Sequence, residues 1–308
     1  MSRSSIAVAP TTRPDMHRAL SAAVLRGGGV IATDSDTASG LIWADPAAPS
    51  AFRSVASTMP SLEWVQLPYA GIEPFDEHLS DQYVWTCGKG VYAEPVAEHA
   101  LALALCALRN VAAYHAATSW TAPIGTNLLN SRVTIVGAGG IASSLIRLLS
   151  PFGVDITVVR RRPEPIAGAD RVFAPEEISI AVRGARIVFV AAALTEKTRH
   201  LIDAEALSAM SPDTWIVNVA RGAIIDTDAL LDALETKAIA GAALDVTDPE
   251  PLPTSHRLWT LENAIITPHV GNTPQMGLEL LAGRVEANVA RWLRGDPLIG
   301  TVDLDAHY

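Results

Sequence analysis

The chain has 308 residues, 49% of them hydrophobic and 18% charged, which suits two ordinary globular domains and excludes a disordered chain. Its formal net charge of -10 argues against a general nucleic-acid binder, because such proteins carry a basic surface. It has only two cysteines, Cys87 and Cys106, and its first residues lack the apolar core of a signal peptide, so we expect a soluble cytoplasmic protein without a disulfide framework.

The first part of the chain alternates short apolar runs with more polar or helical segments. The apolar runs are Ile6–Ala9, Val30–Thr33, Gly40–Trp43, Trp64–Leu67 and Tyr83–Thr86. This alternation predicts a first α/β domain.

A long helix is predicted next, from about Pro95 to Tyr114, and it could bridge two domains. It contains the longest apolar stretch of the chain, residues 100–108, which is about half the length that crosses a bilayer. We therefore expect a buried helix and no membrane association. His99 and His115 fall on this helix, where we expect them to be structural.

From Arg132 onward, the sequence predicts a regular series of strands and helices. The strands are Val133–Val136, Ile156–Val159, Ile187–Ala191, Trp215–Val219, Ala242–Asp245 and Ala264–Thr267. The helices are Ile141–Leu149, Ala204–Met210 and Thr227–Leu234, and a final helix, Gln275–Leu293, returns the chain toward the first domain. Continuous Val, Ile and Ala runs in such a series indicate a parallel sheet that is covered on both faces. The fold class is therefore α/β, with two Rossmann-like, doubly wound parallel-sheet domains: residues 1–98 with 275–308, and residues 99–274.

A glycine-rich turn follows the first strand of the second domain. Gly137 would permit the tight turn, Gly139 would let a pyrophosphate approach the backbone, and Ala142 would allow close packing of helix on strand. Free N–H groups and the positive dipole at the start of a helix favour phosphate there. Because the motif joins a strand to a helix within an alternating series, it predicts a dinucleotide site.

The end of the next strand indicates which dinucleotide is bound. An NAD site usually places Asp or Glu there, whereas this chain has Arg160, Arg161 and Arg162, and its nearest carboxylate, Asp155, starts the strand. Arginines suit the 2′-phosphate of NADP(H) through paired donors. A solvated basic turn is the alternative, and some such turns bind NAD(H). We predict that NADP(H) is preferred and that NAD(H) is possible.

Three polar residues then follow later predicted strands: Arg221, Glu250 and His269. Each alone is more often a surface or loop residue. Together, behind a dinucleotide motif, they combine an anion binder, an orienting carboxylate and a proton carrier. The carboxyl edge of an open α/β sheet is where ligands bind, so this set predicts hydride transfer coupled to proton transfer on a carboxylate-bearing substrate.

With these segments placed, the chain resembles the D-isomer-specific 2-hydroxyacid dehydrogenase family over nearly its whole length, and within it the glyoxylate/hydroxypyruvate reductases. The motifs that carry the resemblance, in chain order, span residues 88–99, 137–142, 194–202, 218–226, 241–246, 248–251 and 267–271. One departure is Ala191–Ala193 before Leu194, where the family often has a proline. The resemblance implies a discontinuous flavodoxin-like substrate domain, a Rossmann domain and an active-site cleft between them.

The resemblance also implies roles for the matching residues. Arg221 would hold the carboxylate and carbonyl oxygen of the substrate, His269 would exchange the proton, and Glu250 would orient His269. The backbone at Ala70 and Gly71 would bind the substrate carboxylate. The residues expected at the cofactor are Gly137, Gly139, Gly140, Ile141, Arg160, Arg161, Arg162, Ala220, Asp245 and Gly271.

The expected activity is interconversion of a small 2-keto acid and its D-2-hydroxy acid, without a metal, in a homodimer. Two alternatives remain open: a dinucleotide-sensing protein like the dehydrogenase-like corepressors, and a dehydrogenase of another small anion such as formate or phosphite. The identity of the keto acid is not expected to follow from these motifs. Trp43 and Tyr69 could line its pocket, although core packing is the preferred explanation for these side chains.

Overall fold

The structure, a computed structural model, describes residues 5–304 and divides the chain into two compact units. Unit 1 comprises Met1–Tyr92 and Thr273–Tyr308, and unit 2 comprises Ala93–Asn272. The divisions expected from the sequence, at residues 98/99 and 274/275, lie close to these breaks. Residues 1–4 and 305–308 of the expected first domain lie outside the described residues.

Unit 1 is built on a five-stranded parallel sheet. Its strand order is β2 (Val30–Ile31), β1 (Ser5–Ala9), β3 (Ala38–Trp43), β4 (Trp64–Gln66) and β5 (Val84–Thr86). This 2-1-3-4-5 order is the flavodoxin-like one.

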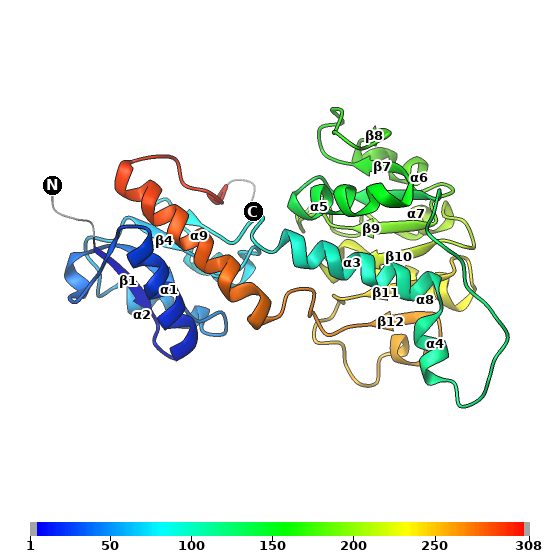
Figure 1. The fold of residues 1–308 in the computed structure, drawn as a ribbon, viewed down its shortest axis with the longest axis horizontal. Coiled ribbons are helices and arrows are strands. Elements are labelled where there is room, and N and C mark those ends of the chain that lie inside the picture. The colour runs from blue at the N-terminus through cyan, green and yellow to red at the C-terminus, as the bar shows by residue number, and fades with distance from the viewer. Residues whose placement is uncertain (1–4, 305–308) are drawn as a thin grey trace. The chain divides into compact units, whose positions relative to one another are not determined.

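Two hydrophobic cores lie on the two faces of this sheet because side chains alternate along a strand. Ile6 and Val8 of β1 belong to the core formed with α1 (Pro14–Arg26) and α9 (Pro274–Arg294), and Ala7 belongs to the opposite core with α2 (Phe52–Ala56). In Figure 1, α1 and α9 lie together on unit 1, and they also contact each other.

Unit 2 is built on a seven-stranded parallel sheet. Its order is β12 (Ala264–Ile266), β11 (Gly241–Leu244), β10 (Trp215–Asn218), β9 (Ile187–Val190), β6 (Arg132–Val136), β7 (Asp155–Val159) and β8 (Arg171–Phe173). The chain winds outward from β6 in both directions, which creates a topological switch point between β6 and β9. Ligands of open α/β sheets bind at such a point, beyond the carboxyl ends of the strands.

Helices cover both faces of the seven-stranded sheet (Figure 1). One hydrophobic core contains side chains of α3 (Ala93–Leu108) and α5 (Gly140–Leu149). The other contains side chains of α6 (Ile178–Ala181), α7 (Ala204–Ser208) and α8 (Thr227–Glu235). This two-sided burial explains the continuous apolar runs of the strands. Short 3-10 helices connect the elements of both units, at Ser35–Thr37, Pro49–Ala51, Glu73–His78, Ser150–Phe152, Pro175–Glu177, Gly222–Ile224 and Arg257–Thr260.

One expectation about these elements was wrong, and one strand was missed. The predicted helix from Pro95 to Tyr114 is two helices, α3 and α4 (Val111–Ala116), and α3 lies wholly in unit 2. Asn110 between them has a φ of 55°, a left-handed conformation that ends a helix and that Asn tolerates well. The edge strand β8 was not anticipated. Within residues 5–304, the structure contains no helix with both the length and the apolarity to cross a membrane.

Candidate active site

The predicted site residues of unit 2 follow the carboxyl ends of neighbouring strands. Gly137 follows β6, Arg160 follows β7, Asp245 follows β11, and Arg221 and His269 lie a few residues beyond β10 and β12. Because all seven strands are parallel, these residues share one edge of the sheet. Ala70 and Gly71 follow β4 of unit 1 in the same way.

The glycine-rich turn has the geometry that a dinucleotide phosphate requires. Gly137 has a φ of 117°, and a Cβ there would lie 2.6 Å from the carbonyl oxygen of Ala191, so only glycine fits. Gly139, the N-cap of α5, has no atom within 4 Å of the position of a Cβ, so its surface is open. The N–H groups of Gly140 and Ile141 begin the helix, where backbone donors lack intrahelical partners. This turn therefore fits a pyrophosphate on the helix axis.

The arginine turn is anchored by the strand that sequence reasoning missed. The backbone N–H of Arg160 donates to the carbonyl oxygen of Phe173 at the end of β8, 3.0 Å away. Arg160 is partly buried, whereas Arg161 and Arg162 are exposed. Asp155 lies at the opposite end of β7, where it pairs with Arg171 at 2.5 Å. The carboxyl end of β7 thus presents positive charge.

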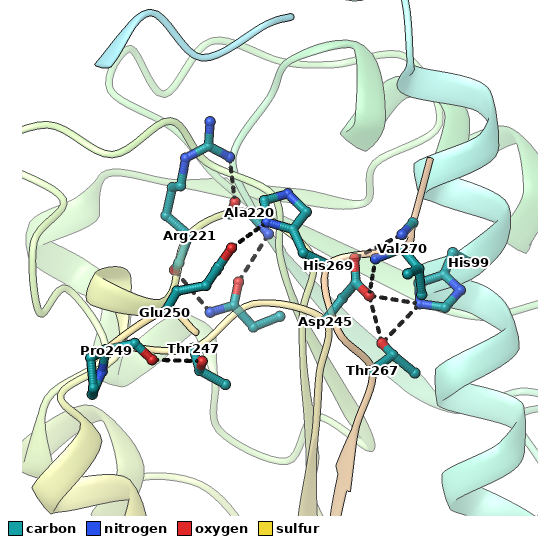
Figure 2. Close-up of polar contacts among 12 residues, drawn as sticks. His99, Ala220, Arg221, Asp245, Thr247, Pro249, Glu250, Thr267, His269 and Val270 are labelled. Carbon is teal, nitrogen blue, oxygen red and sulfur yellow. Dashed lines mark hydrogen bonds and ion pairs between the residues drawn. The ribbon is translucent and has the colours of Figure 1, made fainter. Parts of the chain in front are cut away.

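His269 and Glu250 form a direct pair. Nδ1 of His269 lies 2.6 Å from Oε1 of Glu250, and their side chains point toward each other in Figure 2. An ionised carboxylate only accepts hydrogen bonds, so Nδ1 carries the hydrogen and Nε2 is left for another partner. Both side chains are partly exposed. This arrangement can deliver a proton from Nε2 to a bound molecule.

Arg221 is fixed by its own turn. The buried Asn218 donates through Nδ2 to the carbonyl oxygen of Arg221 at 2.9 Å and accepts from the N–H of Ala220 at 3.0 Å. Nη1 of Arg221 donates to the carbonyl oxygen of Ala220 at 2.8 Å, and the guanidinium and the His269 ring both extend upward in the view of Figure 2. Asn218 was not singled out from the sequence, although its place at the end of a strand was a signal for a turn-forming side chain.

Gly222 brings the Arg221 turn against the segment that leads to Glu250. A Cβ at Gly222 would overlap the carbonyl group of Thr247 and the nitrogen of Asp248. The glycine is therefore required by close backbone approach, which links the positions of Arg221 and Glu250.

Asp245, expected at the cofactor, is buried and hydrogen-bonded within the protein. Its Oδ1 accepts from Thr267 Oγ1 at 2.6 Å and from the N–H of Val270 at 2.9 Å, and its Oδ2 accepts from the N–H of Gly271 at 2.9 Å. Burial alone would raise the pKa of Asp245, but hydrogen bonds from His99, Thr267 and the two backbone N–H groups lower this pKa to about 2. The carboxylate is therefore ionised and holds the loop that carries His269.

The loop of Ala70 and Gly71 is held by contacts within unit 1. The carbonyl oxygen of Tyr69 accepts from the N–H of Gly88 at 2.7 Å, and the hydroxyl of Tyr92 donates to the carbonyl oxygen of Pro68. Trp43 is fully buried and donates through Nε1 to the carbonyl oxygen of Asp45, so it belongs to the core. The described part of the chain gathers no group of three or more His, Cys, Asp or Glu residues that could hold a metal ion.

Comparisons with known proteins agree with this geometry. The model of the family described as D-isomer specific 2-hydroxyacid dehydrogenase, NAD binding domain, matches residues 101–271. An uncharacterized protein in the proB 3′ region of Corynebacterium melassecola is 35% identical over 294 residues, which are 93% of this chain and 95% of that protein. The human glyoxylate reductase/hydroxypyruvate reductase is 36% identical over 187 residues, which are 59% of this chain and 56% of that enzyme.

Solved structures resemble the whole chain. The D-isomer specific 2-hydroxyacid dehydrogenase from Xanthobacter autotrophicus Py2, in complex with NADPH and MES, superposes with a TM-score of 0.84 at 26% identity, covering 100% of both chains. The likeness therefore includes both units.

Proposed function

Because the chain belongs to the D-isomer-specific 2-hydroxyacid dehydrogenase family, we propose that it interconverts a small 2-keto acid and its D-2-hydroxy acid, as a reductase of the glyoxylate/hydroxypyruvate type. The observation that carries this proposal is the 2.6 Å pair of His269, which lies beyond β12, and Glu250, which lies beyond β11. It lies at the same sheet edge as the turn that fits a dinucleotide. The alignment spans only about half of the human reductase, so the substrate class is itself part of the proposal.

Each residue of the proposed site has a separate role in the reduction. A nicotinamide cofactor, with its phosphates held at the glycine-rich turn after β6, would supply the hydride for the carbonyl carbon. Arg221 binds the carboxylate and polarises the carbonyl oxygen, and the backbone of Ala70 and Gly71 is the other proposed carboxylate binder. Nε2 of His269 protonates the carbonyl oxygen, and Glu250 stabilises the ring through Nδ1–H. In oxidation of the hydroxy acid, His269 takes the proton back.

A matrix of 2-keto acids against NADPH and NADH, followed by loss of reduced cofactor, tests the activity. We expect turnover of glyoxylate, hydroxypyruvate or a related 2-keto acid. His269→Gln should lower kcat by about a hundredfold or more, the range typical of a lost general acid. Normal turnover by this variant would overturn the mechanism. Tight cofactor binding without turnover across the panel would overturn the enzymatic function in favour of dinucleotide sensing.

NADP(H) is the proposed coenzyme, with the cofactor held by Gly137, Gly139, Gly140 and Ile141 at its phosphates. Arg160, Arg161 and Arg162 at the end of β7 would grip a 2′-phosphate, and the Xanthobacter relative is described with NADPH. We expect a higher kcat/KM with NADPH than with NADH, and Arg160→Ala should narrow that ratio. A higher kcat/KM with NADH, or an Arg160→Ala variant with unchanged selectivity, would contradict the preference.

A homodimer is proposed from an exposed apolar arm, residues 111–129. Val111, Trp120, Ile124 and Leu129 are all exposed, although large apolar side chains seldom gather on the surface of a monomer. Tyr114 joins α4, the first part of this arm, to the later part by donating through its hydroxyl to the carbonyl oxygen of Ile124 at 2.7 Å. A second copy of the chain is the proposed occupant, because most oligomers of soluble proteins are symmetric pairs of identical chains.

Light scattering after size exclusion tests the dimer. Wild type should have twice the mass of one chain, and Trp120→Asp should weaken the dimer. Leu25→Asp, a matched change at an exposed apolar residue of α1, should leave the mass unchanged. A monomeric wild type, or a Trp120→Asp dimer of wild-type affinity, would exclude the arm as the interface.

A cytoplasmic location is proposed as well, because Cys87 and Cys106 are both free thiols, as in reducing compartments.

A further inference from the structure

A second histidine lies behind the loop that carries His269. His99 belongs to α3, and its Nε2 lies 3.1 Å from Oγ1 of Thr267 and 3.2 Å from Oδ1 of Asp245 (Figure 2). From the sequence, this histidine looked structural. Instead, it contacts Thr267 and Asp245, the two side chains that hold the loop of residues 267–271.

The hydrogen atoms available to His99, Thr267 and Asp245 determine which of them donates in this cluster. The single hydroxyl hydrogen of Thr267 points to Oδ1 of Asp245 at 2.6 Å, so the oxygen of Thr267 has only acceptor capacity left. The carboxylate of Asp245 is ionised and also only accepts. Nε2 of His99 therefore faces two acceptors and must carry a hydrogen. His99 is the donor that completes the cluster.

The loop needs such support because its backbone is strained. His269 has a φ of 53°, which residues with a Cβ adopt only when surrounding contacts enforce it. Its N–H donates to the carbonyl oxygen of Asp245 at 2.8 Å, and the next two N–H groups donate to the carboxylate of Asp245. Asp245 thus binds three consecutive N–H groups: its backbone carbonyl binds that of the proposed proton donor, and its carboxylate fixes the two that directly follow it.

We propose that His99 is a positioning residue for the proton transfer: its Nε2–H orients Asp245 and Thr267, which hold the His269 loop in its left-handed conformation. This inference rests on the proposed function, which assigns the proton to His269. His99 itself touches neither Glu250 nor His269 in the hydrogen bonds of the cluster. It acts through the loop.

The test compares His99→Leu, which removes the donor, with His99→Gln, whose amide nitrogen can take the place of Nε2. With NADPH and the best 2-keto acid, His99→Leu should lower kcat by about tenfold, as for one lost hydrogen bond to a charged group. KM for the keto acid should stay within about twofold, because Arg221 and the Ala70–Gly71 loop lie outside the cluster. His99→Gln should recover most of kcat. His17→Leu, a histidine of α1 in unit 1, is the matched control and should match wild type.

Amide hydrogen exchange supplies a readout that does not depend on turnover. A peptide containing residues 267–272 should exchange faster in His99→Leu than in wild type or His99→Gln. Thr267→Val, which removes the hydroxyl, should have the same effect and serves if His99→Leu fails to fold. No turnover by wild type would defeat the proposed function, while exchange would still test the cluster. Wild-type kcat and exchange in His99→Leu, or equal losses in the Leu and Gln variants, would overturn the inference.

Discussion

At the scale of single residues, the proposed acid depends on its carboxylate partner. Glu250→Gln keeps the shape of the side chain and an oxygen that can accept from Nδ1 of His269, but it removes the negative charge. Charge-assisted hydrogen bonds are roughly twice as strong as neutral ones, so we expect kcat to fall by about ten- to a hundredfold. Steady-state kinetics with NADPH measure this change.

A double variant controls for effects outside the pair. If Glu250 acts through His269, then Glu250→Gln combined with His269→Gln should lose little more than His269→Gln alone, because residues that act as a unit are not additive. Fully multiplicative losses would show that Glu250 acts independently of the histidine.

The lowered pKa of Asp245 predicts how the stability of the protein changes in acid. Its pKa is lowered from 3.8 to about 2 on folding, so its ionised form stabilises the folded state. That stability is fully present above pH 4 and is lost as the pH falls through about 2. The shift corresponds to about 2 kcal/mol at neutral pH.

Denaturant unfolding of Asp245→Asn between pH 7 and pH 2.5 checks this sign. The difference in free energy of unfolding between wild type and variant should be largest near pH 7 and should shrink below pH 4. Asp155→Asn, at a more exposed carboxylate, is the control and should give a small difference. A difference for Asp245→Asn that grew toward low pH would contradict the assignment.

At the scale of elements, the turn after β10 and the segment before Glu250 behave as one piece. Gly222→Ala would force a Cβ onto the carbonyl group of Thr247, so this segment must move. We expect the free energy of unfolding to drop by about 1–3 kcal/mol, as in other overpacked sites, and kcat to fall because Glu250 moves with the segment. Thermal unfolding and kinetics measure the two effects.

Gly139→Ala is the contrasting glycine variant. Its Cβ would meet no protein atom within 4 Å, so the stability of the protein without cofactor should barely change. The same Cβ would occupy the open surface where the pyrophosphate is proposed to approach, so the Kd for NADPH should rise. Unchanged NADPH binding would place the phosphates elsewhere.

The elements were predictable where periodicity is strong and less so where it is weak. Runs such as Val133–Val136 and Ile187–Ala191 gave strands because both faces of the sheet are buried. The strand β8, Arg171–Phe173, escaped because an edge strand of three residues starting with arginine has no apolar pattern. The break at Asn110 escaped because apolar residues continue on both sides, and only the backbone reveals the left-handed turn.

At the scale of the whole molecule, each unit has its own cores on both faces of its own sheet. We therefore expect calorimetry to show two unfolding transitions. NADPH should raise the free energy of unfolding of unit 2 alone, by about 2.7 kcal/mol when its concentration is 100 times Kd. The unfolding temperature of unit 1 should not change. A single transition that shifts as a whole with NADPH would show that the two units unfold together.

From the sequence, only those site residues could be predicted whose chemical type and position after a strand are both distinctive. Arg221, Glu250 and His269 are recognisable because their chemistry is unusual at strand ends. His99 is not, since a histidine on an apolar helix resembles any core residue. Its contact with Asp245 and Thr267 exists because α3 packs on β10 and β11, which brings together residues far apart in the chain.

Unit 1 is built from two segments that flank unit 2 in the sequence, and this affects the order in which the two units can fold during synthesis. Helix α9 supplies Leu281, Val285 and Val289 to the core that contains Ile6 and Val8. A ribosome delivers every residue of unit 2 before it delivers α9, so unit 2 can fold while unit 1 still lacks one wall of its core. Until α9 emerges, that apolar face of the nascent chain is open to chaperones.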